Sequence, residues 1–284
     1  MPDYGHELEF GVFLTPSAAN AEEVVALARL ADSVGLDLVA FQDHPYQPRF
    51  LDTWTLLAFV AARTERIQLA TDVLNLPLRP PAMVARAAAS LDVLTGGRVE
   101  LGLGAGASWD AIEAMGGRRL SPGERVDALE EAIDVIRSIW EVERQDRVDY
   151  DGSHYGLHGA ARGPAPRHRM QIWVGAYRSR MLGLVGRKAD GWLPSMPHLA
   201  PGDLAAGNAV IDEAAVAAGR RPSEIRRLLN VVPPTVDELT ALALEDGIGT
   251  FVMIGDDADA IRVFAETVAP AVRERVASER SRRR

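Results

Sequence analysis

The chain has 284 residues, of which 47% are hydrophobic and 25% are charged, a composition typical of a globular protein with a full core. The net charge of −9 argues against a nucleic-acid partner, and the absence of cysteine excludes disulfides and thiolate chemistry. No apolar run approaches the ~20 residues of a membrane span, and the first residues do not form a secretion signal. We therefore expect a cytoplasmic protein that binds neither membranes nor nucleic acid.

Short apolar runs alternate with segments of helical periodicity along the chain. The apolar runs predict eight strands, at residues 8–14, 38–41, 67–71, 99–103, 172–174, 191–193, 226–232 and 250–254. The periodic segments predict eight helices, at residues 21–34, 52–62, 81–95, 122–143, 178–184, 204–218, 236–244 and 258–276. Eight strand–helix units predict a parallel sheet closed into a TIM-like (β/α)8 barrel, a single α/β domain over residues 1–284. A doubly wound open sheet is the alternative, but the first strand–helix turn lacks its G-x-G-x-x-G motif.

Three segments depart from this regular pattern. Residues 148–170 hold tyrosines, glycines and prolines, and we expect a hairpin or other excursion on the barrel rim there. The arginine-rich end, about residues 278–284, is expected to be a solvated, disordered tail. The link between the seventh strand and its helix, residues 233–235, is short.

The second predicted strand ends in Asp43-His44, and Pro45 stops the strand from continuing. The C-terminal ends of barrel strands form the catalytic face of such folds. Histidine can move a proton near neutral pH, so we predict that His44 is catalytic. The alternative is a structural pair in which Asp43 only caps the residues that follow.

Two glycine-containing strand ends are further candidates. Gly104 and Gly106 could let the backbone approach a flat ligand or a phosphate, or could serve only turn geometry. The segment 175–179 opens a helix whose free N–H groups, with Arg178 and Ser179, favour a phosphate. In the alternative, these are ordinary first-turn residues.

The remaining histidines indicate no metal site. His154 and His158 have a metal-ligand spacing, but the glycines around them argue against the helix that such a site needs. His168 and His198 lie near prolines and are expected in surface loops.

Six segments, taken together and in order, resemble the bacterial-luciferase-like family of flavin- and deazaflavin-dependent oxidoreductases. The segments are residues 42–45, 69–73, 79–82, 97–106, 173–176 and 189–192. This resemblance implies a TIM-like barrel with a redox cofactor, coenzyme F420 or FMN, in its mouth. His44 matches the histidine beside the reactive ring, and Asp43 matches an aspartate often found in deazaflavin users, which favours F420.

The resemblance also implies which residues hold the cofactor. Asp72 and Val73 match a bulge that supports the ring, with a cis peptide bond between them. Gly106 and Ala107 match backbone contacts, and residues 175–178 match the phosphate cradle. The predicted cofactor-binding residues are Asp43, Thr71, Asp72, Val73, Gly104, Gly106, Ala107, Gly175, Ala176, Tyr177, Arg178 and Ser179.

The favoured function is hydride transfer between F420 and a small organic substrate, with His44 moving the accompanying proton. An FMN-dependent monooxygenase using oxygen is the first alternative. A lyase or isomerase acting on a phosphorylated metabolite, and a cofactor-binding protein without turnover, are the others. Pro45-Tyr46 and the short link at 233–235 depart from the family pattern and leave the substrate open. Family resemblance and the apolar surplus at 56–62 and 83–89 also predict a homodimer through the helices after strands two and three.

Overall fold

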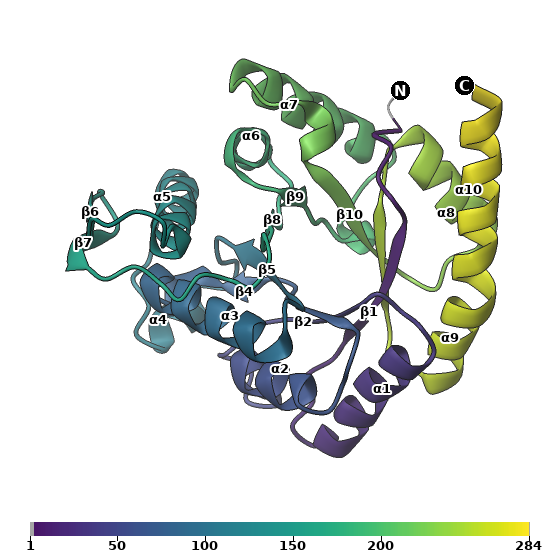
Figure 1. Cartoon of the computed structure of the whole chain (residues 1–284), viewed down its shortest axis with the longest axis horizontal. Helices are drawn as coiled ribbons and strands as arrows, with labels where there is room; N and C mark the ends of the chain where they lie inside the picture. Colours follow the sequence, from purple (N-terminus) through teal and green to yellow (C-terminus); the bar gives the residue numbers. More distant parts are fainter. Residues whose placement is uncertain (1–2, 284) are drawn as a thin grey trace.

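A computed structural model describes residues 3–283, and its centre is a closed barrel of parallel strands (Figure 1). The barrel strands are β1 (Glu9–Leu14), β2 (Leu38–Phe41), β3 (Gln68–Thr71), β5 (Val99–Gly104), β8 (Ile172–Val174), β9 (Gly191–Trp192), β10 (Arg226–Val231) and β11 (Thr250–Ile254). They pair in chain order, and parallel pairing of β1 with β11 closes the ring. The two-residue β4 (Leu74–Asn75) continues from β3 and pairs with the end of β5. The predicted TIM-like barrel is therefore confirmed.

Helices surround the barrel on its outer side. Their bounds are α1 (Ala21–Ser33), α2 (Thr53–Ala61), α3 (Pro81–Thr95), α4 (Trp109–Ala114), α5 (Pro122–Trp140), α6 (Ser179–Lys188), α7 (Asp203–Ala217), α8 (Val236–Glu245), α9 (Ala258–Val263) and α10 (Ala269–Arg283), with a π-helical turn at Phe264–Val268. Side chains fix several starts: Asp52 caps α2, and Ser121 with Glu124 forms a capping box at α5. In the part of the chain that the structure describes, no helix is both long and apolar enough to cross a membrane.

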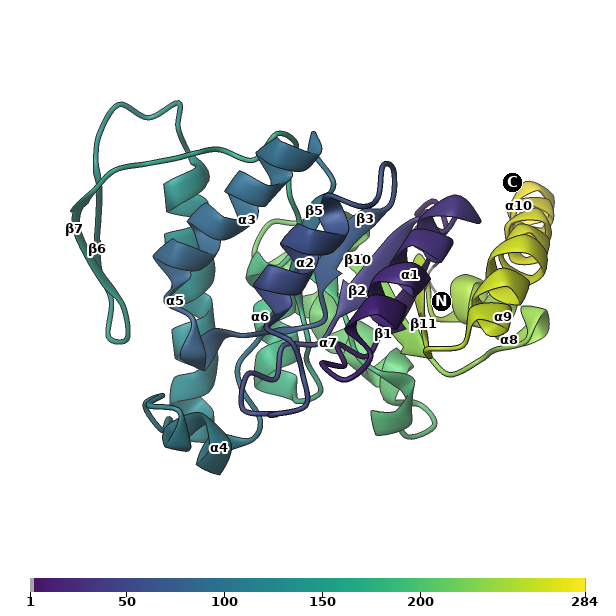
Figure 2. The same cartoon turned by 90° about the horizontal axis from the view of Figure 1, so that it is seen from below.

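The irregular segment forms a hairpin, as expected. Strands β6 (Val148–Asp151) and β7 (Gly156–Ala160) pair antiparallel and lie outside α5 (Figure 2). The Glu131 carboxylate on α5 accepts the backbone N–H groups of residues 153, 154 and 155, which holds the hairpin tip against that helix.

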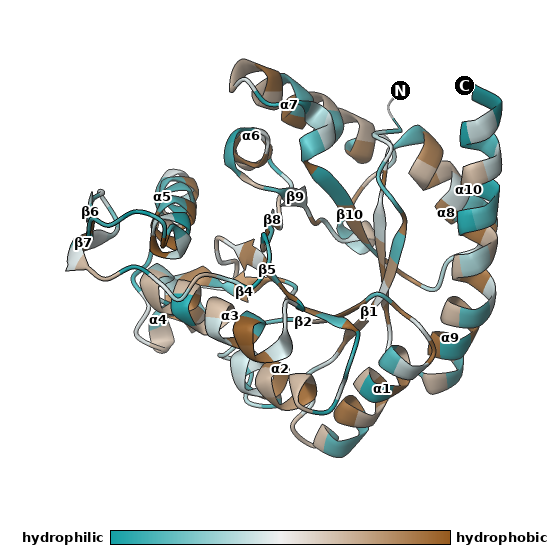
Figure 3. Cartoon of the chain, in the orientation of Figure 1, coloured by the Kyte–Doolittle hydropathy of each residue, from teal (hydrophilic) through white to brown (hydrophobic). Residues whose placement is uncertain are grey.

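The expected disorder of the C-terminal tail is wrong as far as Arg283, because α10 continues to that residue. Its last turns are hydrophilic (Figure 3), yet they are tied down by specific contacts. The guanidinium of Arg280 donates two hydrogen bonds of 2.6 Å to the carboxylate of Asp3 and one to the carbonyl of His6. Val276, one turn earlier, is buried. Residue 284 lies outside the described residues.

The barrel interior is filled through its middle by apolar side chains. The cluster comprises Leu38, Ala40, Ala70, Trp173, Leu193, Leu228 and Val252, with Phe13 and Val73 packed on it. A second, larger apolar layer lies between the strands and the helices. Because the middle of the barrel is packed, a ligand must bind beyond this layer, and the C-terminal ends of the strands are the usual place in such folds.

Candidate functional site

A cleft of about 1280 Å³ opens at the C-terminal ends of the barrel strands. The following predicted site residues line it: Asp43, His44, Asp72, Val73, Gly104, Gly106, Ala107, Gly175, Ala176, Tyr177, Arg178 and Ser179. Thr71 is the exception. It is buried, and its hydroxyl donates a 2.7 Å hydrogen bond to the carbonyl of Gly102 on the neighbouring strand β5, so it braces the sheet and does not line the cleft.

Val73 determines where glycine is needed at the floor of the cleft. A Cβ atom on Gly104 would lie 2.6 Å from the Val73 Cγ2 atom, and one on Gly175 would lie 3.3 Å from it. These two glycines therefore make room for Val73, which with Phe13 and Leu193 provides an apolar floor. The peptide bond between Asp72 and Val73 is cis, as the resemblance implies.

Gly106 has a different reason to be glycine. Its φ of +87° is in the left-handed region, and a Cβ there would lie 2.7 Å from Pro77. The turn geometry weighed from the sequence thus accounts for this residue, while its backbone still faces the cleft.

Asp43 is occupied by protein partners. Its carboxylate accepts two 2.7 Å hydrogen bonds from the Arg79 guanidinium and a 2.9 Å bond from the N–H of Asn75. Arg79 also donates to Asp52, the N-cap residue of α2, at 2.6 Å. Sequence reasoning missed Arg79, although a buried carboxylate requires a cation partner. Asp43 therefore ties the loop after β2 to the segment after β4, which positions the adjacent His44.

His44 lies against two aromatic rings. Its imidazole stacks on Tyr46 with centroids 5.5 Å apart and lies 6.4 Å from Phe50, nearly parallel to both. Burial lowers the pKa of His44, and the negative charge of Asp43 opposes that shift in part. A neutral imidazole at pH 7 is ready to accept a proton from a ligand in the cleft.

Asp72 forms a second polar feature of the floor. Its Oδ1 accepts a 3.1 Å hydrogen bond from the side-chain amide of Asn230, on the opposite wall of the barrel. The same amide nitrogen donates to the Ser195 hydroxyl at 2.9 Å. Burial raises the pKa of Asp72 to about 7, although the bond from Asn230 acts in the other direction. Asn230 and Ser195 were missed from the sequence, but a polar residue near the end of the apolar run 228–231 was a usable signal.

The proposed phosphate cradle lies at the start of α6. Arg178 is the N-cap residue, no side chain caps the helix, and Ser179 is its first residue. Arg178 and Ser179 are exposed and line the cleft, so their donors can reach an anion there. Tyr177 accepts a 2.9 Å hydrogen bond from the N–H of Ser195. His198 is exposed, in keeping with the expected surface position, and it also lines the cleft and meets the Tyr177 ring edge-on at 5.9 Å.

His168 is also not a free surface residue. Its Nδ1 lies 3.1 Å from the Asp92 carboxylate and its Nε2 lies 3.2 Å from the Glu100 carboxylate. The hydrogen bond with Glu100 is the largest cause that raises the pKa of His168 to about 9. These partners lie on α3 and β5, 76 and 68 residues before His168 in the sequence. At that separation, no local sequence pattern indicates the contact. This cluster braces the loop that enters β8 and lies outside the cleft.

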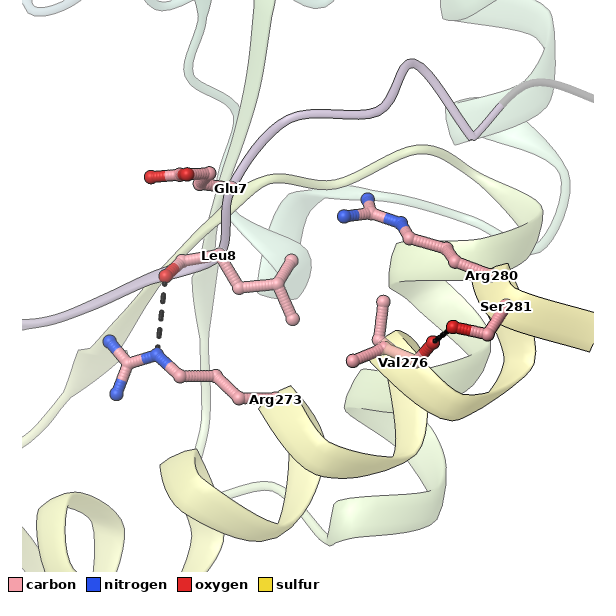
Figure 4. Close-up of a pocket in the computed structure, with 7 residues that line it drawn as sticks. Glu7, Leu8, Arg273, Val276, Arg280 and Ser281 are labelled. Carbon is pink, nitrogen blue, oxygen red and sulfur yellow. Dashed lines mark hydrogen bonds between the residues drawn. The ribbon is translucent and has the colours of Figure 1, made fainter. Parts of the chain in front are cut away.

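A smaller pocket of about 450 Å³ lies at the other end of β1 (Figure 4). It is formed by residues 7 and 8 and by one face of α10 between residues 273 and 281, and Arg273 there donates to the Leu8 carbonyl. Its two arginines are already paired, Arg273 with Asp37 and Arg280 with Asp3. The larger cleft, with its histidine, buried acid and open helix start, is therefore the candidate active site.

Comparison with known proteins identifies one matching family and several similar proteins. The luciferase-like monooxygenase family model matches residues 8–246. An F420-dependent glucose-6-phosphate dehydrogenase from Nocardia farcinica is 34% identical over 72% of this chain and 66% of its own length. One from Mycolicibacterium fortuitum is 32% identical over 84% of this chain and 72% of its own length.

Solved structures share the fold. An F420-dependent secondary alcohol dehydrogenase, solved with an F420–acetone adduct, superposes with a TM-score of 0.81 at 21% identity, over 94% of this chain and 99% of that one. A riboflavin lyase solved with modified FMN gives 0.82 at 16% identity, over 95% of this chain and 92% of that one. At these identities the superpositions show the barrel fold alone.

Proposed function

Because this chain belongs to the luciferase-like monooxygenase family, we propose that it is an F420-dependent oxidoreductase that transfers a hydride between the deazaflavin and a small organic substrate. The observation that carries the proposal is the cleft itself, in which an apolar floor, a neutral histidine and an open helix start face one space. The names of the relatives from Nocardia and Mycolicibacterium support F420 as the coenzyme.

The residues present fit a coenzyme that joins a flat ring to a phosphate. Val73, Phe13 and Leu193 offer a flat apolar surface to the ring. Arg178 and Ser179, with the first N–H groups of α6, would bind the phosphate through charge-assisted hydrogen bonds. The ring supplies the hydride chemistry, which no side chain of this protein can perform.

The chain's own contribution is orientation and proton handling. His44 is held between Tyr46 and the loop that Asp43 and Arg79 fix, and its neutral ring would take the proton of a substrate hydroxyl or return it to a carbonyl. The packed barrel below the floor excludes water from one side of the ring.

FMN is the second candidate coenzyme, because it also joins a ring to a phosphate and FMN proteins share this fold. A direct titration separates the two. Purified protein is mixed with each coenzyme while ring fluorescence is followed, and the bound coenzyme is then offered small alcohols and sugar phosphates anaerobically. Binding of F420 and its reduction by one alcohol class supports the proposal. Binding of FMN alone, with oxygen-dependent turnover, would replace it.

We also propose that two copies associate through α2 and α3. Large apolar side chains on these helices are exposed: Phe59 by 49%, Met83 by 62% and Leu94 by 83%. Exposed apolar side chains on neighbouring outer helices are typical of a contact surface. A second copy of this chain would cover them.

A further inference from the structure

Three oxygen atoms at the floor of the cleft lack hydrogen-bond donors within residues 3–283: Asp72 Oδ2, Asn75 Oδ1 and Asn230 Oδ1. All three residues line the cleft, and they are only 8%, 5% and 2% exposed. One amide group, Asn230 Nδ2, serves both Asp72 Oδ1 and Ser195. Three buried acceptors are thus left without donors, which is costly for such groups and most costly for an ionised carboxylate.

Among the residues that the structure describes, no cation acts on the pKa of Asp72. The Arg79 guanidinium, on the segment after β4, is bound by Asp43 and Asp52 and does not line the cleft. Of the elements that line the cleft with Asp72, the loop after β2 brings Asp43 and His44, β1 brings Phe13, β5 brings Gly104, and the residue after β8 is Gly175. The facing residues on β10 and after β9, Asn230 and Ser195, are uncharged. A proton on Asp72 would remove the charge and supply the missing donor, in line with the direction in which burial moves the pKa of Asp72.

We propose that Asp72 is a proton-linked binding residue, which is a neutral carboxylic acid whenever a flat ring covers the floor of the cleft. The proposal rests on the proposed function, because the ring is that of the redox coenzyme. Covering the floor removes the water that still reaches Asp72 and disfavours the carboxylate further. The acid O–H then supplies a donor at the floor, where the buried Asn230 Oδ1 oxygen lacks one. Asn230 is a positioning residue, since it fixes the other oxygen of the acid.

This arrangement couples ring binding to proton uptake. Below about pH 7 Asp72 already holds its proton in the free protein, so binding takes up none there. Above that pH the free protein has lost the proton and the complex regains it. Coenzyme affinity must therefore fall as pH rises, by up to about tenfold per pH unit, until the acid of the complex also ionises. His44 does not produce this effect, because burial lowers its pKa from an already near-neutral value.

The test compares the wild-type protein with Asp72→Asn, which keeps the shape of the neutral acid but cannot titrate. Each is titrated with coenzyme F420 at pH 6, 7, 8 and 9, by ring fluorescence and by calorimetry in two buffers of different ionisation enthalpy. Titration of the coenzyme itself is common to both proteins and cancels. We expect the wild type at pH 8 to take up between about half a proton and one proton more than the variant. Equal proton counts and parallel affinity profiles would overturn the proposal.

Two additions keep the test decisive. If Asp72→Asn does not fold, Asp72→Ser serves as the second non-titrating variant. The ligand-free protein provides a readout independent of the coenzyme, namely the infrared C=O band of a protonated carboxyl that is present in the wild type at pH 6 and absent from the variant. If neither F420 nor FMN binds, the proposed function fails, while this band still reports the buried acid. A carboxyl that is ionised from pH 5 to pH 9 would refute the inference even if F420 binds.

Discussion

Arg79 binds Asp43 through two hydrogen bonds of 2.7 Å, from Nε and Nη2, and so joins the residue before His44 to the turn that follows β4. The Asp43 side chain is 1% exposed and the Arg79 side chain 18%. The pair is thus desolvated, and each partner needs the other.

Replacing Arg79 with alanine should destabilise the protein by ~3–5 kcal/mol, because it leaves a buried carboxylate unpaired. Urea unfolding at pH 7 measures the change. Arg221→Ala is the matched control: that arginine is 80% exposed and pairs with Glu224 across one helical turn, so its loss should cost under about 1 kcal/mol. Equal effects of the two substitutions would contradict a buried ion pair at the site.

Removing the imidazole of His44 should lower turnover by ~10²-fold or more while coenzyme binding changes little, since proton transfer is its proposed task. Steady-state kinetics with the substrate found in the titration measures this effect. His158→Ala, on the exposed strand β7, controls for loss of a histidine as such. Turnover close to the wild-type rate in His44→Ala would remove this residue from the mechanism.

Arg178→Ala should weaken coenzyme affinity by about tenfold with little change in turnover at saturation, because one charge-assisted hydrogen bond to a phosphate is lost at an exposed site. Fluorescence titration gives the affinity. Arg180→Ala is the comparison, since Arg180 lines the same cleft but already pairs with Asp127. A larger loss for Arg180 than for Arg178 would show that the anion is held elsewhere.

The His168 cluster should make stability depend on pH in a defined direction. The pKa of His168 is raised to about 9 in the folded protein from about 6.5 in the unfolded chain. The free energy that protonated His168 adds to stability is therefore complete below pH 6.5 and disappears as pH rises through 9. The difference in unfolding free energy between wild type and His168→Gln should be largest at pH 6 and smallest at pH 10. A difference in unfolding free energy that grows with pH would contradict this prediction.

Association through α2 and α3 predicts a mass of two chains at micromolar concentration, measured by light scattering. The pair of substitutions Met83→Lys and Leu94→Lys should yield monomers, because it places two charges on the proposed contact surface. Val216→Lys, at a 64% exposed position on α7, should leave the mass unchanged. A wild-type monomer would end the proposal.

The strands of the barrel were predictable because barrel strands are buried on both faces, so each appears as a continuous apolar run such as 38–41. The ends of the helices were less predictable than the strands. The helix predicted to reach residue 143 ends at Trp140, because Glu141 has a ψ of 65° and leaves the helical region. The six-residue α4 escaped detection because it is too short to show a period.

Strand-end residues of the site were also predictable, since position along a strand places them. The partners that set their chemistry were not. Arg79 lies 36 residues after Asp43, and Asn230 lies 158 residues after Asp72, so only the closed barrel brings each pair together. The same holds for His168, which the sequence assigned to a surface loop.

The ion pair between Asp3 and Arg280 indicates where the protein can be linked or attached to a surface without blocking the cleft. Two hydrogen bonds of 2.6 Å hold Arg280 to Asp3, and Arg280 lines the pocket at the end of β1 opposite the cleft. A short peptide linker could therefore join the segment at Asp3 to the segment at Arg280 without cutting a barrel strand. A surface attachment beside Asp3 or Arg280 would leave the mouth of the barrel facing the solution, so immobilised protein should remain accessible to its ligands.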